Sequence, residues 1–561
     1  MESDPILQSL GDSIYPNYHL QKMALIERNK MLQYPSFFTK QQITAFTLAM
    51  KSIYLLYNQK IQEASAVAMN ALDYDISSID AYQTLIQASS LFVDVDTQIC
   101  LYRQLISLYK SQVLPKVFSI AQPKPMPLKL HKRKSSKINQ DPTNNDENID
   151  SNINPSLMSN SENKFKIGFL DEKLTDEQVL QQLMLQPYLR LLFSLGEISF
   201  INDNAVLAME CYEEALRFDC DNDFAAEHLA ISYIKVIGMK RNGIHPLPNR
   251  DIHHLMALLD RYDEVLNDEV KYCAKLVISY FDRNSQIKNW TDIFLEFNQK
   301  FPTSIAFIFE EENGKSQYPL IIAFSEWIDL VVDMHQLLYG NSEQFYKKIL
   351  EKNRAQETYR NRQGRQVAAK VASTYLEKAR DCLHNQNYLD VVNNCSLSKR
   401  MFHDANYPSE RWYLNSPFAV ISNRSISAMH MNLWLVACHD LRFTLAMNPK
   451  HAKSLILMRN VALNFGLDSL AQKMNEISEK VSQFLSNSDS ENGRITDSEW
   501  LEMSKKAIAY LSLEAFVLEK QGKLDDEKLS HLMKVGIENF YCDIPCSTNL
   551  LDSLPWLNDQ D

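Results

Sequence analysis

The feature that most constrains the fold is a pattern of small and aromatic residues that repeats within helical sequence. It is clearest at 189–222, where Gly196 is followed twelve residues later by Ala208, and then by Tyr212 and Ala215. Apolar residues at three- and four-residue spacing predict helices through this stretch. Small residues at the crossing point let two helices approach closely, so the spacing predicts a tightly packed helical pair. Such a pair cannot bury its apolar faces alone and has to stack on other pairs.

The same pattern recurs in 34-residue frames that begin at residues 45, 189, 223, 372, 418, 452 and 508. Its small, aromatic or helix-ending positions include Gly196, Ala208, Tyr212, Ala215, Ala230, Tyr233, Ala379, Ser425, Ala437 and Pro449. These residues resemble the tetratricopeptide-repeat family over about half of the chain. The resemblance implies an all-α fold, in which helical hairpins form a right-handed solenoid in two or more blocks.

Composition divides the chain further. Residues 122–165 combine a proline-rich start, a basic run and an Asn/Asp/Ser tract, and they hold few large apolar groups. Because such a segment cannot offset its ordering entropy by burial, we predict a disordered linker there. The predicted order is an N-terminal segment at 1–37, a helical repeat-like block at 38–121, the linker at 122–165, a repeat block at 166–250, a non-consensus helical block at 251–365, a repeat block at 366–490, a helical repeat-like block at 491–545 and a polar tail at 546–561.

Glycine usage and net charge exclude several function classes. No two of the 12 glycines lie within three residues of each other, which excludes a G-x-G-x-x-G dinucleotide fingerprint. The net charge of −12 argues against a general nucleic-acid binder. His253 and His254 would point about 100° apart on a helix, so they cannot easily share one metal ion. We predict no enzyme activity, no cofactor and no metal site.

The nine cysteines are scattered and suit a reducing compartment. The most apolar stretch, Tyr318 to Met334, is interrupted by three acidic residues and is too short to span a bilayer. We expect a cytoplasmic protein with no membrane partner and no nucleic-acid partner. Nuclear import through the basic segment Lys129–Lys137 is the alternative location.

Within 372–485 the resemblance narrows to the three-repeat domains of co-chaperones. The residues that carry it are Ser422-Asn423-Arg424-Ser425 and Asn448-Pro449-Lys450-His451-Ala452-Lys453. In those domains, Lys, Arg and Asn side chains hold the carboxylates of acidic chaperone C-termini by charge-assisted hydrogen bonds. The resemblance implies that Asn423 and Lys453 match two of the five clamp positions. Arg380 stands at a third clamp position. At the remaining two positions the sequence has Leu376 and Leu457, which differ from the polar residues of the family.

We therefore predict a non-enzymatic scaffold or adaptor that captures partner peptides in a groove lined by the first helix of each pair. One alternative is a chaperone cofactor that binds acidic C-terminal tails through Asn423, Lys453 and Arg380. A second is a subunit of a larger assembly. An enzyme within 251–365 is the rival from another class, and no residue pattern there supports it.

Overall fold

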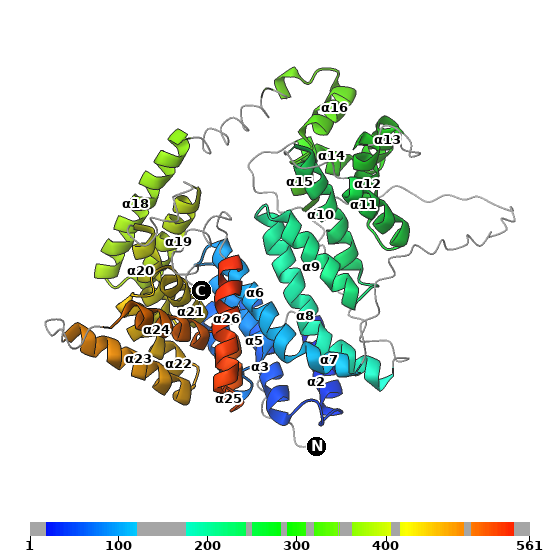
Figure 1. Ribbon diagram of the computed structural model, residues 1–561. Helices are drawn as coiled ribbons and strands as arrows, with labels where there is room; N and C mark the ends of the chain where they lie inside the picture. The colour runs from blue at the N-terminus through cyan, green and yellow to red at the C-terminus, as the bar shows by residue number, and fades with distance from the viewer. Residues whose placement is uncertain are drawn as a thin grey trace.

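The regular structure of the described residues is entirely helical (Figure 1). The computed structural model describes residues 18–120, 175–242, 249–281, 289–309, 319–345, 347, 362–404, 416–486 and 495–543. The predicted all-α class is therefore confirmed for these ranges. The predicted linker at 122–165, with its basic segment Lys129–Lys137, and the tail at 546–561 lie outside them.

The helices fall into three blocks along the chain. The N-terminal block holds α2 (Tyr18–Leu32), α3 (Lys40–Tyr57), α4 (Ile61–Tyr74), α5 (Ile79–Ser89), α6 (Val95–Gln112) and α7 (Leu114–Ile120). The middle block holds α8 (Asp176–Ile201), α9 (Ala205–Phe218), α10 (Asp223–Asn242), α11 (Asn249–Arg261), α12 (Asp268–Phe281), α13 (Trp290–Lys300), α14 (Pro302–Phe309), α15 (Pro319–Phe324) and α16 (Ile328–Tyr339). The C-terminal block holds α18 (Arg362–His384), α19 (Tyr388–Asp404), α20 (Ser416–His430), α21 (Trp434–Met447), α22 (Ala452–Asn464), α23 (Asp468–Ser486), α24 (Asp497–Tyr510), α25 (Leu513–Lys520) and α26 (Asp526–Asp543).

Six helical hairpins turn in the same way. In the frames that begin at 45, 189, 372, 418, 452 and 508, the fifteenth residue has a left-handed backbone, with φ between 58° and 64°. These residues are Gln59, Asp203, Gln386, Asn432, Gly466 and Gly522. In every case the next amide donates to the carbonyl five residues back, at 2.8 to 3.0 Å. This is the Schellman motif, which ends one helix and redirects the chain into the next.

Packing within a hairpin follows the small-residue positions. Gly196 on α8 lies against the ring of Tyr212 on α9, and an added Cβ would be 2.7 Å from the Tyr212 Cζ atom. A glycine at this crossing therefore lets the tyrosine ring lie flat against the α8 backbone. The other repeat positions are buried with the exception of the half-buried Pro449: Ala208, Tyr212, Ala215, Ala230, Tyr233, Ala379, Ser425 and Ala437.

The frame at 223 departs from this geometry. Its fifteenth residue, Ile237, lies inside α10, which continues to Asn242. Gly238 there lies against Trp327, whose indole Nε1 donates to the Ile234 carbonyl at 2.9 Å. The glycine makes room for Trp327, the N-cap residue of α16 in the same block, and α10 continues through this position without a turn.

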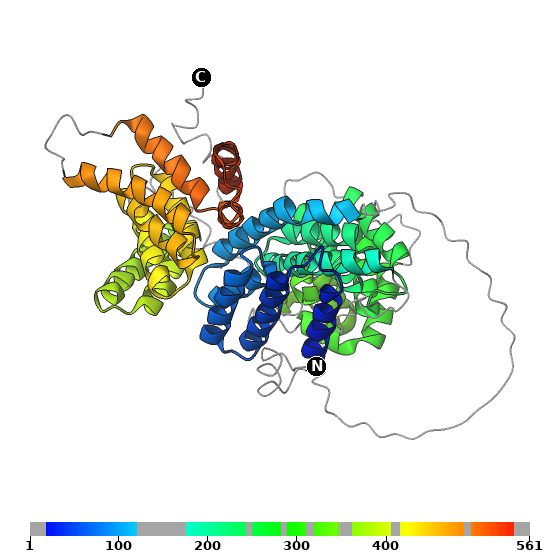
Figure 2. The ribbon, with the colours of Figure 1, turned by 90° about the horizontal axis from the view of Figure 1, so that it is seen from below.

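The N-terminal block lies between the other two blocks (Figures 1 and 2). Towards the middle block, Arg190 on α8 donates to Asp80 on α5 at 3.0 Å, and Gln83 donates to Ser194 at 2.7 Å. Towards the C-terminal block, α5 and α6 pack on α21, and α6 also packs on α25. One continuous apolar core includes residues of all three blocks. The order in space therefore differs from the order along the chain.

Candidate functional site

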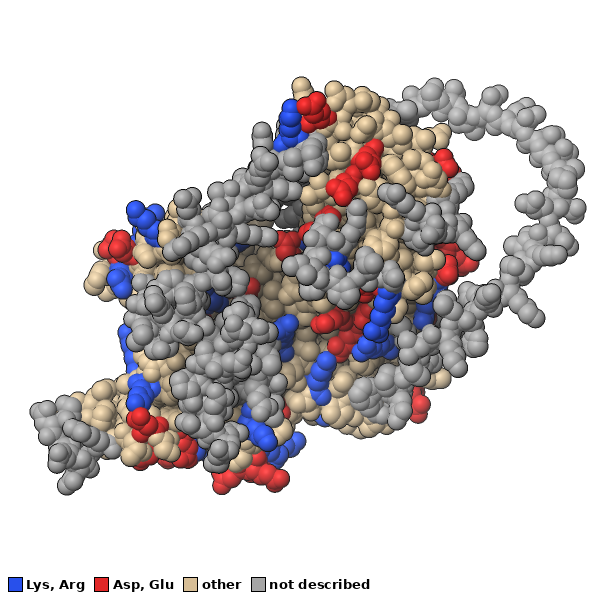
Figure 3. All heavy atoms as spheres, turned by 45° about the horizontal axis from the view of Figure 1, so that its top comes forward, with Lys and Arg blue, Asp and Glu red and all other residues tan. Residues whose placement is uncertain are grey.

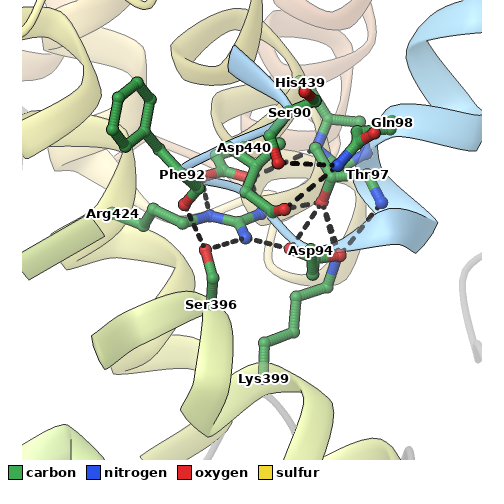
Figure 4. Close-up of polar contacts among 11 residues, drawn as sticks. Ser90, Phe92, Asp94, Thr97, Gln98, Ser396, Lys399, Arg424, His439 and Asp440 are labelled. Carbon is green, nitrogen blue, oxygen red and sulfur yellow. Dashed lines mark hydrogen bonds and ion pairs between the residues drawn. The ribbon is translucent and has the colours of Figure 1, made fainter. Parts of the chain in front are cut away.

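A buried cluster of charged and polar side chains joins the N-terminal and C-terminal blocks (Figure 4). We call this cluster the ionic junction. It consists of Asp94 and Thr97 at the start of α6, Ser396 and Lys399 on α19, Arg424 on α20 and Asp440 on α21. Asp94 is the N-cap of α6, because its side chain accepts from the Thr97 amide at 2.9 Å. Asp94 therefore has two roles: it caps α6, and its carboxylate pairs with cations of the C-terminal block.

Arg424 is fully buried, and all five of its N–H donors have partners. Its Nε and Nη2 atoms donate to the two Asp440 carboxylate oxygens at 2.8 and 2.7 Å. Nη2 also reaches the Thr97 hydroxyl at 3.0 Å, and Nη1 donates to Ser396 at 3.1 Å and to Asp94. The bidentate pair fixes the guanidinium plane, so the remaining donors reach Asp94 and Thr97 of the N-terminal block and Ser396 on α19.

Lys399 completes the charge balance. Its Nζ atom lies 2.9 Å from an Asp94 carboxylate oxygen and 2.8 Å from the Thr97 hydroxyl. Two cations, Lys399 and Arg424, therefore face two carboxylates, Asp94 and Asp440. Buried charges are tolerated when they are paired and hydrogen-bonded in this way.

The protonation states follow from these contacts. Burial alone would raise the pKa of Asp94, but the charges of Lys399 and Arg424 hold it well below the usual value. Burial would also raise the pKa of Asp440, but the charge and hydrogen bonds of Arg424 lower the Asp440 pKa below its usual value. Burial lowers the pKa of His439, whose Nδ1 atom lies 3.1 Å from Asp440, so this imidazole is neutral at pH 7.

The residues predicted to bind a peptide lie outside this junction. Arg380 on α18 and Lys453 on α22 are exposed, and Asn423 on α20 is half-buried. None of these three side chains makes a hydrogen bond or ion pair with another residue in the described ranges. They occupy the first helices of three successive hairpins. Leu376, at a fourth clamp position, is buried in the core between α18 and α19.

The segment that carries Arg380 and Lys453 is richer in cations than in anions. Residues 362–464 contain 13 Lys and Arg against 6 Asp and Glu, in a chain whose net charge is −12. Lys370, Lys378 and Arg400 are also exposed there. Figure 3 shows blue side chains, with red ones beside them, on the lobe at left, which carries this block. Arg424 and Lys399 already bind carboxylates inside the molecule, whereas Arg380 and Lys453 present their charges to solvent.

The sequence indicated Asn423 as a candidate binding residue, but the buried role of its neighbour Arg424 was not predicted. A signal was present, because Arg424 lies three or four residues from Val420, Ile421 and Ala428, all of which are buried. A charged residue in the middle of an apolar helical stripe predicts a buried ion pair. Its partners Asp94 and Asp440 were not identifiable, since nothing in the sequence places residue 94 beside residue 424.

The described ranges contain no group of three or more His, Cys, Asp or Glu side chains placed to hold a metal ion. No helix in those ranges combines the length and the apolar character needed to cross a bilayer. No protein-family model matches the chain, and no match was found among curated proteins or solved structures.

Proposed function

We propose that the chain is a non-enzymatic adaptor of the tetratricopeptide type, whose C-terminal block captures acidic peptides. The observation that carries the proposal is the position of three side chains on the first helices of three successive hairpins: the exposed Arg380 and Lys453 and the half-buried Asn423. A peptide that lies across these helices would meet all three side chains. Exposed charges steer an acidic ligand and make charge-assisted hydrogen bonds with its carboxylates.

The repeated turn supports the solenoid part of the proposal. Because Gln386, Asn432 and Gly466 end their helices with the same Schellman motif, the hairpins α18–α19, α20–α21 and α22–α23 have equivalent connections. Equivalent hairpins stack with a regular rotation and create an extended binding surface on one side. The ionic junction would keep this stack in a fixed position relative to the N-terminal block.

The test is a titration of the full chain with a fluorescent peptide that ends in Met-Glu-Glu-Val-Asp, followed by anisotropy. We expect saturable binding in the micromolar range, weakened at least tenfold (about 1.4 kcal/mol) by Lys453→Glu or Arg380→Glu. Lys60→Glu is the matched control, because it makes the same charge change on an exposed lysine of the N-terminal block. Binding that survives both C-terminal substitutions would refute this location of the site.

The same peptide distinguishes a chaperone cofactor from a general acidic-peptide adaptor. Asn423 and Lys453 favour the chaperone cofactor, because they stand at two positions of the clamp. A clamp for acidic C-termini needs the terminal carboxylate, so a C-terminally amidated peptide should then bind at least tenfold more weakly. A general acidic-peptide adaptor would bind the acid and amide forms with similar affinity.

A further inference from the structure

The middle block carries charge of the opposite sign to the proposed peptide site. Residues 175–345 contain 27 Asp and Glu against 13 Lys and Arg. Figure 3 shows several red side chains, together with blue ones, over the lobe at right, which carries this block. A cation-rich partner would therefore approach the middle block, whereas an anionic partner would approach the C-terminal block.

An apolar and aromatic surface lies at the outer end of this acidic block. Tyr339, in the last turn of α16, is 64% exposed. Its ring lies 4.7 Å from the His335 ring and 6.2 Å from the Phe309 ring, measured between centroids. Phe345 stacks on His335 at 4.3 Å and lies 5.9 Å from Phe309. We call these four residues the aromatic cluster, and an exposed tyrosine supported by rings from two helices is typical of an interface anchor.

A hollow lies on the same side of α16. It measures about 390 Å³ and is lined by Val332, Gln336, Gly340, Asn341, Ser342 and Glu343. Val332, Gln336 and Tyr339 share one helix face because they are four and then three residues apart. Gly340 caps the helix in the left-handed conformation with no atom near the place where a Cβ would be, so the turn leaves the hollow open. The hollow therefore adjoins the exposed tyrosine.

The rim of this surface is acidic. Asp329, Asp333 and Glu343 are exposed. Asp333 accepts a hydrogen bond from the Tyr280 hydroxyl at 2.8 Å, and Glu343 pairs with Lys347 at 2.7 Å in an exposed contact. Such exposed contacts exchange readily with an incoming cation, because surface ion pairs contribute about 0 to 1 kcal/mol. An exposed aromatic ring beside a hollow, with carboxylates around both, complements a helix that carries Lys or Arg beside large apolar side chains.

We infer that this surface of α16 docks a basic amphipathic helix from a partner protein. The helix packs an apolar side chain on the exposed Tyr339 ring and Val332, and places its cations against Asp333 and Glu343. The docking goes beyond capture of an acidic peptide and does not depend on it, since the two surfaces lie on different blocks. A chain with both surfaces would bridge an acidic partner and a basic one.

The test uses the full chain and a synthetic amphipathic helix with Leu and Trp on one face and Lys on the other, labelled with fluorescein. We expect saturable binding, weakened at least tenfold by Tyr339→Ala. The double variant Asp333→Asn/Glu343→Gln should weaken binding several-fold and reduce its dependence on salt concentration. Affinity for the acidic peptide should be unchanged in both variants.

The matched control is Asp260→Asn/Asp263→Asn, which removes the same charge from two exposed residues. These residues lie just before the start of α12, whereas Tyr280, the partner of Asp333, lies near its end. With 14 residues, α12 separates the two sites by about 20 Å. The control should change the affinity by less than about twofold. The inference is overturned if the Lys peptide does not saturate, if Tyr339→Ala binds like the wild type, or if the control weakens binding as much as the rim variant. A version of the peptide with Glu in place of Lys should not bind this surface.

Discussion

Replacing Arg424 with methionine tests whether the ionic junction holds the N-terminal and C-terminal blocks together. The substitution removes the guanidinium and leaves two carboxylates in the interior. Asp94 would retain Lys399 and the Thr97 contacts, but Asp440, which is fully buried, would lose its bidentate partner and would keep the His439 contact. Breaking a buried ion pair by removing one partner costs about 3 to 5 kcal/mol. We expect a loss of this size in the free energy of unfolding of the C-terminal block.

The double variant Arg424→Met/Asp440→Leu separates charge from packing. It removes the orphaned carboxylate together with the guanidinium, and replacing a buried pair with apolar residues is often neutral. The double variant should therefore be more stable than Arg424→Met alone, a strongly non-additive result. Urea titration followed by near-ultraviolet circular dichroism measures both variants. A loss below about 1 kcal/mol for Arg424→Met, or additive effects in the cycle, would show that the junction contributes little.

The pH dependence of the Arg424→Met effect has a fixed sign. The folded-state pKa values of Asp94 and Asp440 are lowered, so their contribution is complete above the unfolded value near 4 and is lost as the pH falls below it. Without Arg424, burial raises the pKa of Asp440 in the variant, so the difference between wild type and variant should be largest at pH 8 and should shrink as the pH falls. A difference that grows as the pH falls would contradict the assignment of charged carboxylates.

Three further predictions concern the rest of the fold. Gly196→Ala should cost about 1 to 3 kcal/mol in the same titration, because its Cβ would overlap the Tyr212 ring, and Tyr212→Leu should offset part of this loss. Glu27 is buried beside Arg190, and burial raises its pKa to about 7. Its ionisation therefore destabilises the fold as the pH rises from about 4.5 to 7, so Glu27→Gln should stabilise the protein at pH 8 and change little at pH 4. A protease site inserted between 121 and 174 and then cut should leave two fragments that co-elute in gel filtration, because α5 and α6 pack on both other blocks. Separation of the fragments would contradict the shared core.

The helical hairpins were predictable because their determinants are local. Small residues such as Gly196 and Ala437 lie where two adjacent helices cross, and the crossing needs only the sequence of one hairpin. In the structure the turns recur at one position of the frame, since Asn432 and Gly466 are the fifteenth residues of successive frames. At 223 the frame was misleading, because the packing of Trp327 on Gly238 comes from a segment almost 90 residues away.

The arrangement of the blocks was not predictable, because it depends on contacts between residues far apart in the chain. Asp80 and Asp94 look like ordinary acids near helix starts, and only the folded chain brings them to Arg190 and Arg424. The exposed basic residues Arg380 and Lys453 were found from a family resemblance. The charge contrast between the middle and C-terminal blocks was present in the sequence, but it became informative only when the structure separated these blocks in space.

An adaptor has to hold two partners at once, and sedimentation velocity with two dyes measures this most directly. The full chain is mixed with the labelled acidic peptide and the labelled basic helix, each recorded at its own wavelength. The account predicts that both dyes sediment together with the chain, that Lys453→Glu removes only the acidic peptide and that Tyr339→Ala removes only the basic helix. Displacement of one peptide by the other, or loss of both from either variant, would contradict it.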